Sequence, residues 1–417
     1  MVELNHAEGE RWAKAELTKL LTNHSTVADP FPLLKWLREN DPVPEGNGLC
    51  LATRFDDVVA LFRDKRLSRQ KAAIAETAAH SPEGDDEILH QAEQAWIAMM
   101  INQDEPGHMR IRRILDEAFR PERVLQWRSR VEAITAELID RVRDKDEFDL
   151  LKELGYPLPE TVICELMGVP LADHALWGAW TEAVINAGRT ATPTPAQIAN
   201  VSAAIKNFYL YLRDLVAERR ANLGDDLVSV LIRAADEGGG LSELELSGTL
   251  QMLIQAGHET TANLIGNGMF ELLKHPDQYE RLRQDPGLVP SAVEEMLRYA
   301  SPSHWSQARV ATEDIRIGGE TIPSGCPVMM AINSANRDPA VFEEPEKFDI
   351  GRTRNRHVAF AAGAHFCLGS MLARQEAQAM FEAIVTRLPK LELAEQPELK
   401  TTFVRALKSL RVRRAAG

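Results

Sequence analysis

The sequence is poor in cysteine, and it lacks any long hydrophobic run. Only four cysteines occur among its 417 residues, and no two of them form a CxxC pair: Cys50, Cys164, Cys326 and Cys367. Isolated cysteines behind a charged N-terminus that does not resemble a signal peptide are typical of a reducing cytoplasm, without disulfides. No segment approaches the roughly 20 apolar residues that span a bilayer, so we expect a cytoplasmic protein outside the membrane.

Positive charge is also in short supply. The 48 Lys and Arg residues face 62 Asp and Glu residues, a formal net charge of -14, which disfavours nucleic acid as a general partner. No internal repeat and no long low-complexity linker divides the chain, although its length alone would allow more than one domain. A chain of this size that is 44% hydrophobic can bury a cofactor. We expect one domain over residues 1–417.

Helical periodicity dominates the chain, and strand-like segments are short and few. The pattern predicts helices over residues 109–143, 203–220, 242–274 and 368–388. Strands are expected at residues 49–53, 315–322, 328–332 and 410–413. The sequence therefore predicts a mainly α protein with small β-sheets.

The longest predicted helix carries polar residues in its apolar middle. It begins at a capping box of Ser242 and Glu245, and its centre reads LIQAGHETTANLI. For an isolated pattern of this kind, a solvent-facing stripe with a packing glycine at Gly257 is the more common explanation. The alternative is a helix opened beside a ligand, where Glu259 handles protons and Thr260 turns its hydroxyl away from the backbone ladder.

Two further motifs lie towards the C-terminus. Glu295 and Arg298 are three residues apart and therefore neighbours on one helix face, where an exposed pair contributes only about 0.3 kcal/mol. Cys367 lies in the stretch FAAGAHFCLGS, among glycines and small residues. A lone cysteine is more often a small buried hydrophobe than a ligand, so each motif by itself is weak.

In order and spacing, AGHETT, EEMLR, SANRDPAVF and FAAGAHFCLG together resemble the motifs of bacterial cytochrome P450 monooxygenases, over nearly the whole chain. The resemblance implies a single, mainly α domain with the shape of a triangular prism, enclosing haem b. The chain departs from the family pattern at Ala361, where glycine is usual, and at Lys347, where arginine is common. We expect Ala361 to alter loop packing only, whereas Lys347 leaves open the third partner of Glu295 and Arg298.

The resemblance assigns Cys367 as the thiolate ligand of the haem iron. A helical pattern follows the cysteine directly, and a helix N-terminus favours negative charge. Gly363 and Gly369 are expected to let backbone N–H groups approach the sulfur, and Phe360 to pack over the loop. The haem propionates need cationic partners. Here the resemblance points to four residues: His108, Arg112, Arg309 and His365.

Glu259 and Thr260 resemble the acid-alcohol pair of the family. The pair implies that dioxygen is activated with electrons from NAD(P)H and that one oxygen atom enters a C–H bond. The expected substrate is an apolar small molecule, a natural-product intermediate. Ala256 and Trp305 are expected to border it. Trp305 lies four residues before Arg309, at a position the family turns towards haem.

Nothing in the chain resembles a flavin or iron–sulfur domain, so the electrons must come from outside. The resemblance implies a ferredoxin and a ferredoxin reductase, with the ferredoxin docking near Cys367 on a monomeric enzyme. Because the chain is acidic overall, that face should be locally basic. The candidates are four arginines: Arg110, Arg113, Arg120 and Arg374.

Two alternatives stay open. The same haem could catalyse oxidative coupling or nitration of an aromatic substrate, which sequence motifs do not distinguish from oxygen insertion. A haem-thiolate sensor or carrier would keep Cys367 without needing Glu259 and Thr260, so the presence of that pair disfavours it.

Overall fold

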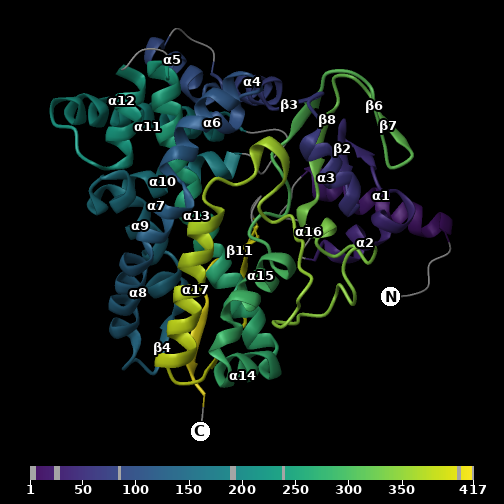
Figure 1. The fold of residues 1–417 in the computed structure, drawn as a ribbon. Coiled ribbons are helices and arrows are strands. Elements are labelled where there is room, and N and C mark those ends of the chain that lie inside the picture. The colour runs from purple at the N-terminus through teal and green to yellow at the C-terminus, as the bar shows by residue number, and fades with distance from the viewer. Residues whose placement is uncertain are drawn as a thin grey trace.

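A computed structural model describes residues 6–22, 29–82, 86–187, 194–236, 240–401 and 405–415. Helices form most of the molecule and the strands are short, which confirms the predicted mainly α class (Figure 1). Within these ranges, no helix is both long and apolar enough to cross a membrane.

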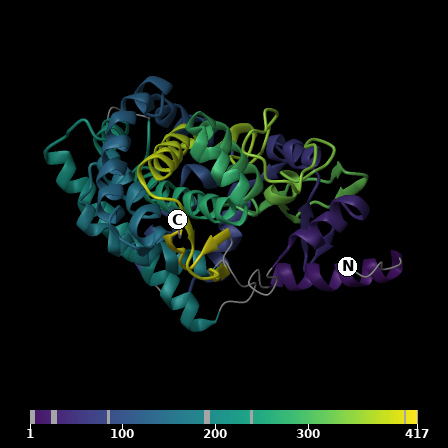
Figure 2. The same ribbon diagram turned by 90° about the horizontal axis from the view of Figure 1, so that it is seen from below.

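The N-terminal part combines short helices with a small sheet. Its elements are α1 (His6–Thr22), α2 (Phe31–Asn40), β1 (Glu45–Gly46), β2 (Leu49–Ala52), α3 (Phe55–Arg63) and β3 (Leu67–Ser68). Seen from below, this purple segment lies at one end of the molecule, away from the blue and teal helices (Figure 2).

A long run of helices follows. It comprises α4 (Arg69–His80), α5 (Glu87–Ile97), η2 (Met100–Asn102), α6 (Gly107–Ala118), α7 (Pro121–Gln126), α8 (Arg128–Val142), the short strand β4 (Glu147–Asp149), η3 (Leu151–Gly155), α9 (Pro157–Met167), η4 (Leu171–Asp173), α10 (His174–Ala187), α11 (Pro195–Ala221), α12 (Leu227–Asp236) and α13 (Glu243–Lys274).

The C-terminal part returns to mixed structure. It contains α14 (Pro276–Gln284), η5 (Pro286–Leu288), α15 (Val289–Tyr299), β5 (Arg309–Ala311), β6 (Ile315–Ile317), β7 (Glu320–Ile322), β8 (Pro327–Met330), α16 (Ile332–Ala335), η6 (Gly363–His365), α17 (Ser370–Arg387), β9 (Leu391–Leu393), β10 (Leu399–Thr401), β11 (Arg405–Leu407) and β12 (Arg411–Arg414).

Two of the predicted elements are wrong in detail. The predicted helix over residues 109–143 is divided among α6, α7 and α8. Pro121 has no backbone N–H and begins α7, and a second break lies at Trp127, between α7 and α8. The predicted strand over residues 315–322 is a hairpin of β6 and β7. Gly318 and Gly319 turn the chain there with φ of 61° and 90°.

The largest sheet joins distant parts of the chain in the order β1-β2-β8-β5-β3. Parallel β2 and β8 bring Cys50 opposite Val328, and antiparallel β5 places Arg309 opposite the same valine. The four cysteines are free thiols, although the Sγ atoms of Cys50 and Cys326 lie 3.0 Å apart. The sheet thus fixes Arg309 beside the N-terminal segment.

Helix α13 passes through the middle of the molecule (Figure 1). It begins at the predicted capping box, in which the Ser242 hydroxyl accepts the Glu245 N–H and the Glu245 side chain accepts the Ser242 N–H. The helix runs without a break to Lys274 and packs against α9, α11, α15 and α17. Since most of its side chains are buried, α13 is the central helix of the core.

Candidate active site

The cysteine loop ends where α17 begins. The Cys367 N–H donates to the Phe360 carbonyl over 3.0 Å, and Gly369 is the N-cap of α17. Burial raises the pKa of the half-buried Cys367 thiol, while a hydrogen bond from the Gly369 backbone and the charges of Arg112 and Arg374 act against that rise. The backbone donor therefore comes from Gly369, as the sequence predicts.

Two residues of the cysteine loop, Ala361 and Gly363, have positive φ angles, which favour glycine. Gly363 has φ of 73°, and a Cβ there would lie 2.8 Å from the Phe62 carbonyl oxygen at the end of α3. Its glycine makes room for α3, and the expectation that it also lets a backbone donor approach the sulfur stays a prediction. Ala361 has φ of 59°, a left-handed conformation that disfavours a side chain. The expectation that Ala361 alters loop packing only is therefore wrong, because the alanine also strains the backbone.

Three of the four predicted propionate partners lie close together, and one of them, His365, belongs to the cysteine loop itself. The rings of His108 and His365 are 4.1 Å apart between centroids. Arg309 is 7% exposed, and its Nη1 donates to the Phe62 carbonyl over 3.2 Å. Burial, and next the charge of the neighbouring Arg69, lowers the pKa of Arg309 to about 10, with Asp104 opposing. The structure thus brings a buried cation and two imidazoles together.

Within the described residues, these groups have no anionic partner. Both ring nitrogens of the buried His108 have no hydrogen-bond partner in the described part of the chain, and no described carboxylate lies within ion-pair distance of Arg309. Burial lowers the pKa of His365 to about 3, and the charges of His108, Arg309, Arg69 and Arg112 add to the shift. A pair of carboxylates would satisfy this cluster, so the residues present fit haem propionates.

Arg112 contacts the loop from α6. Its Nη1 donates to the Phe366 carbonyl over 2.7 Å, and its Nε lies 2.7 Å from the Asp116 carboxylate. Arg112 therefore holds the chain directly before Cys367, and its predicted contact with a propionate stays a prediction.

Phe360 is fixed by a second arginine. The guanidinium of Arg374 lies 4.5 Å from the centre of the Phe360 ring, and it forms a two-point ion pair with Glu294 over 2.6 and 2.9 Å. His357 reaches the same carboxylate at 3.0 Å. These contacts brace the loop against α15, and they occupy the charge of Arg374 that the sequence assigns to ferredoxin docking.

The polar centre of α13 is not an opened helix. Thr260 donates its hydroxyl to the Ala256 carbonyl over 3.0 Å, which leaves the helix continuous, so the expectation of an opened helix is wrong. Ala256 is exposed and Thr260 half-exposed, although the flanking stretches of α13 are buried. A Cβ on Gly257 would lie 2.8 Å from Ile163 of α9. Ala256 and Thr260 thus face open space, while Gly257 admits α9.

The Glu295 and Arg298 pair is fully buried and not exposed. Their side chains meet at 2.7 and 2.8 Å, and both are 0% exposed. Arg352 is the third partner, with its Nε 3.1 Å from Glu295 Oε2. Lys347 contributes only its backbone carbonyl, to Arg298 at 2.9 Å. No sequence signal singled out Arg352, because it lies in an irregular segment that only the fold brings to Glu295.

Trp305 lies in a different place from the one expected. It is 3% exposed and packs in a cluster with α1 and α2, including Leu17 and Leu34, and its ring stacks on His304 with centroids 5.5 Å apart. This burial disfavours the prediction that Trp305 borders a substrate.

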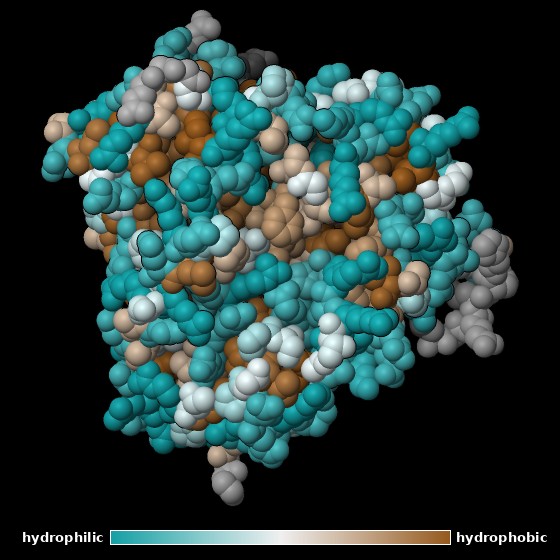
Figure 3. All heavy atoms as spheres, viewed as in Figure 1, coloured by the Kyte–Doolittle hydropathy of each residue, from teal (hydrophilic) through white to brown (hydrophobic). Residues whose placement is uncertain are grey.

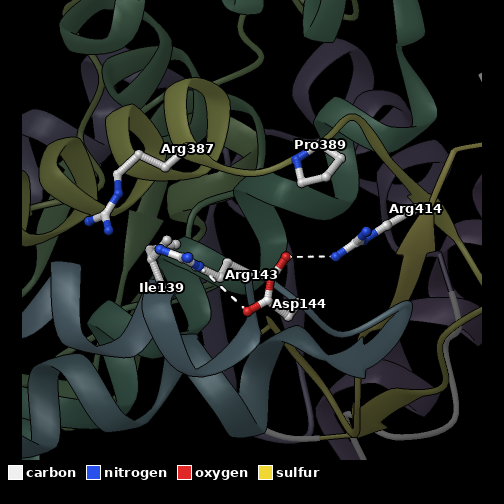
Figure 4. A pocket seen from close by; sticks show the side chains of 6 residues that line it. All are labelled: Ile139, Arg143, Asp144, Arg387, Pro389 and Arg414. Carbon is white, nitrogen blue, oxygen red and sulfur yellow. Dashed lines mark hydrogen bonds and ion pairs between the residues drawn. The ribbon is translucent and has the colours of Figure 1, made fainter.

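One surface pocket of about 330 Å³ lies apart from these residues. It is lined by Ile139, Arg143, Asp144, Arg387, Pro389 and Arg414 (Figure 4). None of the site residues predicted from the sequence lines it, and its arginines come from the ends of α8, α17 and β12.

The model of the cytochrome P450 family matches residues 65–409. The chain belongs to the cytochrome P450 family. Among relatives of this P450, the polyketide biosynthesis cytochrome P450 PksS of Bacillus subtilis is 36% identical, over 92% of this chain and 95% of its own. The cytochrome P450 monooxygenase PikC of Streptomyces venezuelae is 37% identical, over 94% and 92%.

Solved structures agree with the fold of this P450. A complex of P450BioI with an acyl carrier protein ligated to hexadec-9Z-enoic acid matches with a TM-score of 0.84 and 32% identity, over 93% of this chain and 99% of that one. The predicted fold class and enzyme class are confirmed: the chain is a cytochrome P450 monooxygenase. Its cofactor is haem, and bacterial relatives take electrons from NAD(P)H through redox partners.

Proposed function

We propose that this P450 hydroxylates or epoxidises an apolar natural-product intermediate. The observation that carries the proposal is the pairing of two features: the acid-alcohol pair on α13 beside the exposed Ala256, and an anion-deficient cluster of one buried arginine and two imidazoles near Cys367. When bound there, haem with a cysteine thiolate supplies dioxygen activation.

The site residues would have three roles: binding haem, delivering protons and contacting the substrate. Cys367 would ligate the iron, with the Gly369 N–H on its sulfur, while Arg309, His108 and His365 would hold the propionates. Glu259 would hold a proton on its carboxyl group and pass it towards the Thr260 hydroxyl, which currently donates to the Ala256 carbonyl. The exposed Ala256 would contact the substrate.

The substrate class rests on the relatives. PksS is named for polyketide biosynthesis, and one structural neighbour is bound to an acyl carrier protein. A screen should therefore include free polyketides and acyl chains tethered to a carrier protein, with difference absorbance of the haem as the binding signal. Product analysis with labelled dioxygen then separates oxygen insertion, which labels the product, from oxidative coupling, which does not.

The Thr260→Ala variant tests the catalytic assignment. We expect it to bind substrate but to divert reducing equivalents to peroxide, because the hydroxyl that passes protons is gone. Thr249→Ala is the matched control, since Thr249 is buried on the same helix about three turns earlier. Unchanged coupling of NAD(P)H to product in Thr260→Ala would remove Thr260 from proton delivery.

The Cys367→Ser variant tests the ligand assignment. We expect the reduced carbon monoxide spectrum of a thiolate haem to disappear, because the alcohol does not replace the thiolate ligand. Cys326→Ser is a control at a buried cysteine outside the loop. A variant of Cys367 that keeps the thiolate spectrum would contradict the assignment.

The docking of ferredoxin needs a revised set of arginines. Arg110 is bonded to Glu245 and Arg120 to Glu117, and Arg374 is bonded to Glu294. Exposed arginines on segments that contact the loop are Arg63 of α3 and Arg113 of α6, and Arg354 and Arg356 are exposed in the chain that precedes the loop. The segment that leads into α17 crosses the face shown in Figure 1, and apolar residues surface in the middle of that face within a hydrophilic rim (Figure 3).

Charge reversal at Arg113 and Arg356 should slow reduction by ferredoxin and weaken its salt dependence, without changing substrate binding. Reversal at Arg316, an exposed arginine on β6, is the control. Equal rates at low salt would place the docking surface elsewhere.

Three further expectations from the sequence stay predictions: that the chain is one domain, that it is a monomer and that it is cytoplasmic. Size-exclusion chromatography tests the oligomeric state, and cell fractionation tests the location.

A further inference from the structure

Two buried cysteines from distant parts of the chain meet at one end of the largest sheet. Cys50 lies in β2, and Cys326 directly precedes β8, the parallel neighbour of β2 (Figure 1). Their Sγ atoms are 3.0 Å apart, although 276 residues separate them in the sequence. Because an S–S bond is about 2.05 Å long, the two sulfurs need to approach by only about 1 Å to become bonded. The fold therefore holds two thiols within reach of each other.

The backbone of the sheet fixes both cysteines. Cys50 lies opposite Val328 in the parallel ladder. The Ala311 N–H donates to the Cys326 carbonyl over 3.0 Å, and the Gly325 N–H donates to the Ala311 carbonyl over 2.8 Å. Two small apolar residues could pack here without any chemistry, as buried cysteines often do. A pair of thiols in contact, each held by backbone bonds, also meets the geometric requirement for a cross-link.

Exposed turns lie beside both cysteines. Asn47 and Gly48 are exposed before β2, and residues 323–325 are exposed before β8. The Cys326 Sγ lies 3.9 Å from the Gly48 carbonyl oxygen, and Cys326 is 9% exposed, against 3% for Cys50. A small oxidant therefore reaches Cys326 before it reaches Cys50.

We propose that peroxide oxidises this pair to a reversible disulfide between β2 and the turn before β8. Hydrogen peroxide first converts the Cys326 thiol to a sulfenic acid, with release of one water. The Cys50 sulfur then attacks the Cys326 sulfur, a second water leaves and the S–S bond forms. Two thiols thus lose two hydrogen atoms, and one peroxide becomes two waters. This modification site goes beyond the proposed function and does not rest on it.

The surroundings of the pair suit a slow and reversible reaction. Burial, and next the hydrogen bond to Cys326, raises the pKa of Cys50. Because the thiolate is the reactive form of cysteine, a thiol that keeps its proton reacts slowly. The pair should therefore respond to sustained peroxide and stay reduced otherwise, as is usual for redox-sensing disulfides in reducing compartments.

The cross-link would join the two parts of the chain that hold Arg309. Arg309 lies in β5 opposite Val328 of β8, and its Nη1 donates to the Phe62 carbonyl at the end of α3, the helix that follows β2. A bond between β2 and the start of β8 would hinder separation of these parts. The disulfide should therefore keep Arg309 in place and slow the loss of haem.

Thiol mapping of the haem-loaded enzyme tests the cross-link without using activity. Imidazole bound to the iron keeps peroxide from the haem. After limited hydrogen peroxide, only Cys164 and Cys367 of the denatured chain should react with an alkylating reagent, a loss of two of the four free thiols. Mass spectrometry should find the peptides of Cys50 and Cys326 joined, and dithiothreitol should restore all four thiols. Four free thiols after peroxide, or a loss that dithiothreitol does not reverse, would overturn the inference.

Substitutions test the partners and the effect on haem. Peroxide should produce no internal cross-link in Cys50→Ala, whereas Cys164→Ala, at a buried cysteine on α9, should cross-link like wild type. Oxidised wild type should lose haem to apomyoglobin more slowly than reduced wild type, and Cys50→Ala should show no such difference. The comparison of oxidised with reduced wild type is sufficient if Cys50→Ala does not fold. Equal rates of haem loss in the two forms of wild type would overturn the stabilising role of the disulfide.

Discussion

Two groups of buried charge differ in how far the protein itself completes them. Arg298 uses all five of its N–H donors within the chain: two bond Glu295, and three bond the carbonyls of Asn336, Pro345 and Lys347. Arg309, almost as deeply buried, donates in the described structure to one carbonyl, that of Phe62. Buried charge that is saturated stabilises the fold, whereas buried charge left unsaturated indicates a missing anion.

The histidines sharpen this contrast. His108 is buried with neither ring nitrogen bonded in the described ranges, while His357, near the Glu295 network, bonds Glu294 at 3.0 Å. Incomplete hydrogen bonding therefore separates the cofactor side of the cysteine loop from its structural side. Each of the following substitutions tests either the completed network around Glu295 or the incomplete cluster around Arg309.

The largest effect is expected for Arg298→Ala. It leaves Glu295 buried with only Arg352 as a cationic partner and removes five hydrogen bonds, and breaking a buried pair typically costs about 3–5 kcal/mol. Chemical denaturation should show this loss in the free energy of unfolding. Lys347→Ala is the control, because Lys347 contributes only its backbone carbonyl to the network and should change stability by less than about 0.5 kcal/mol. A small loss in Arg298→Ala would show that the network is dispensable.

Arg309→Met should stabilise the haem-free protein but weaken the binding of haem. Without haem, removal of a buried cation without a carboxylate partner should stabilise the chain. With haem, loss of a buried charge partner costs roughly 2–5 kcal/mol, so haem should dissociate about 30-fold faster or more. The decay of haem absorbance measures this rate, with Arg316→Met on β6 as an exposed control. Destabilisation of both forms would show that Arg309 is structural.

A smaller effect concerns acid stability through His108. Burial, and then Arg112, lowers the pKa of His108, so below pH ~6.5 the unfolded chain binds a proton that the folded chain does not. The haem-free protein should therefore lose stability as the pH falls below that value, and His108→Leu should lessen the loss. Denaturation midpoints across pH measure it, with the exposed His90→Leu as control. Bound propionates should also lessen the loss, and equal slopes with and without haem would contradict their contact with His108.

The smallest effect is expected for Ala361→Gly. Because Ala361 has φ of 59°, glycine should relieve about 1–2 kcal/mol of backbone strain in the folded state. Glycine also makes the unfolded chain more flexible, and the resulting entropy cost of folding offsets part of this gain. We expect a net gain of about 1 kcal/mol in the free energy of unfolding, while Gly363→Ala, where φ is 73° and the Phe62 carbonyl is close, should lose more than that. No gain in Ala361→Gly would show that the loop accommodates the alanine without strain.

The sequence by itself determined the helices, the capping box at Ser242 and the order of the motifs that identify the family, because these depend on neighbours within a few residues. Only the tertiary structure decided which distant groups meet. It buried Trp305 against α1 and α2 and brought Arg352 to Glu295. Such contacts depend on how elements pack, and packing leaves no local pattern in the chain.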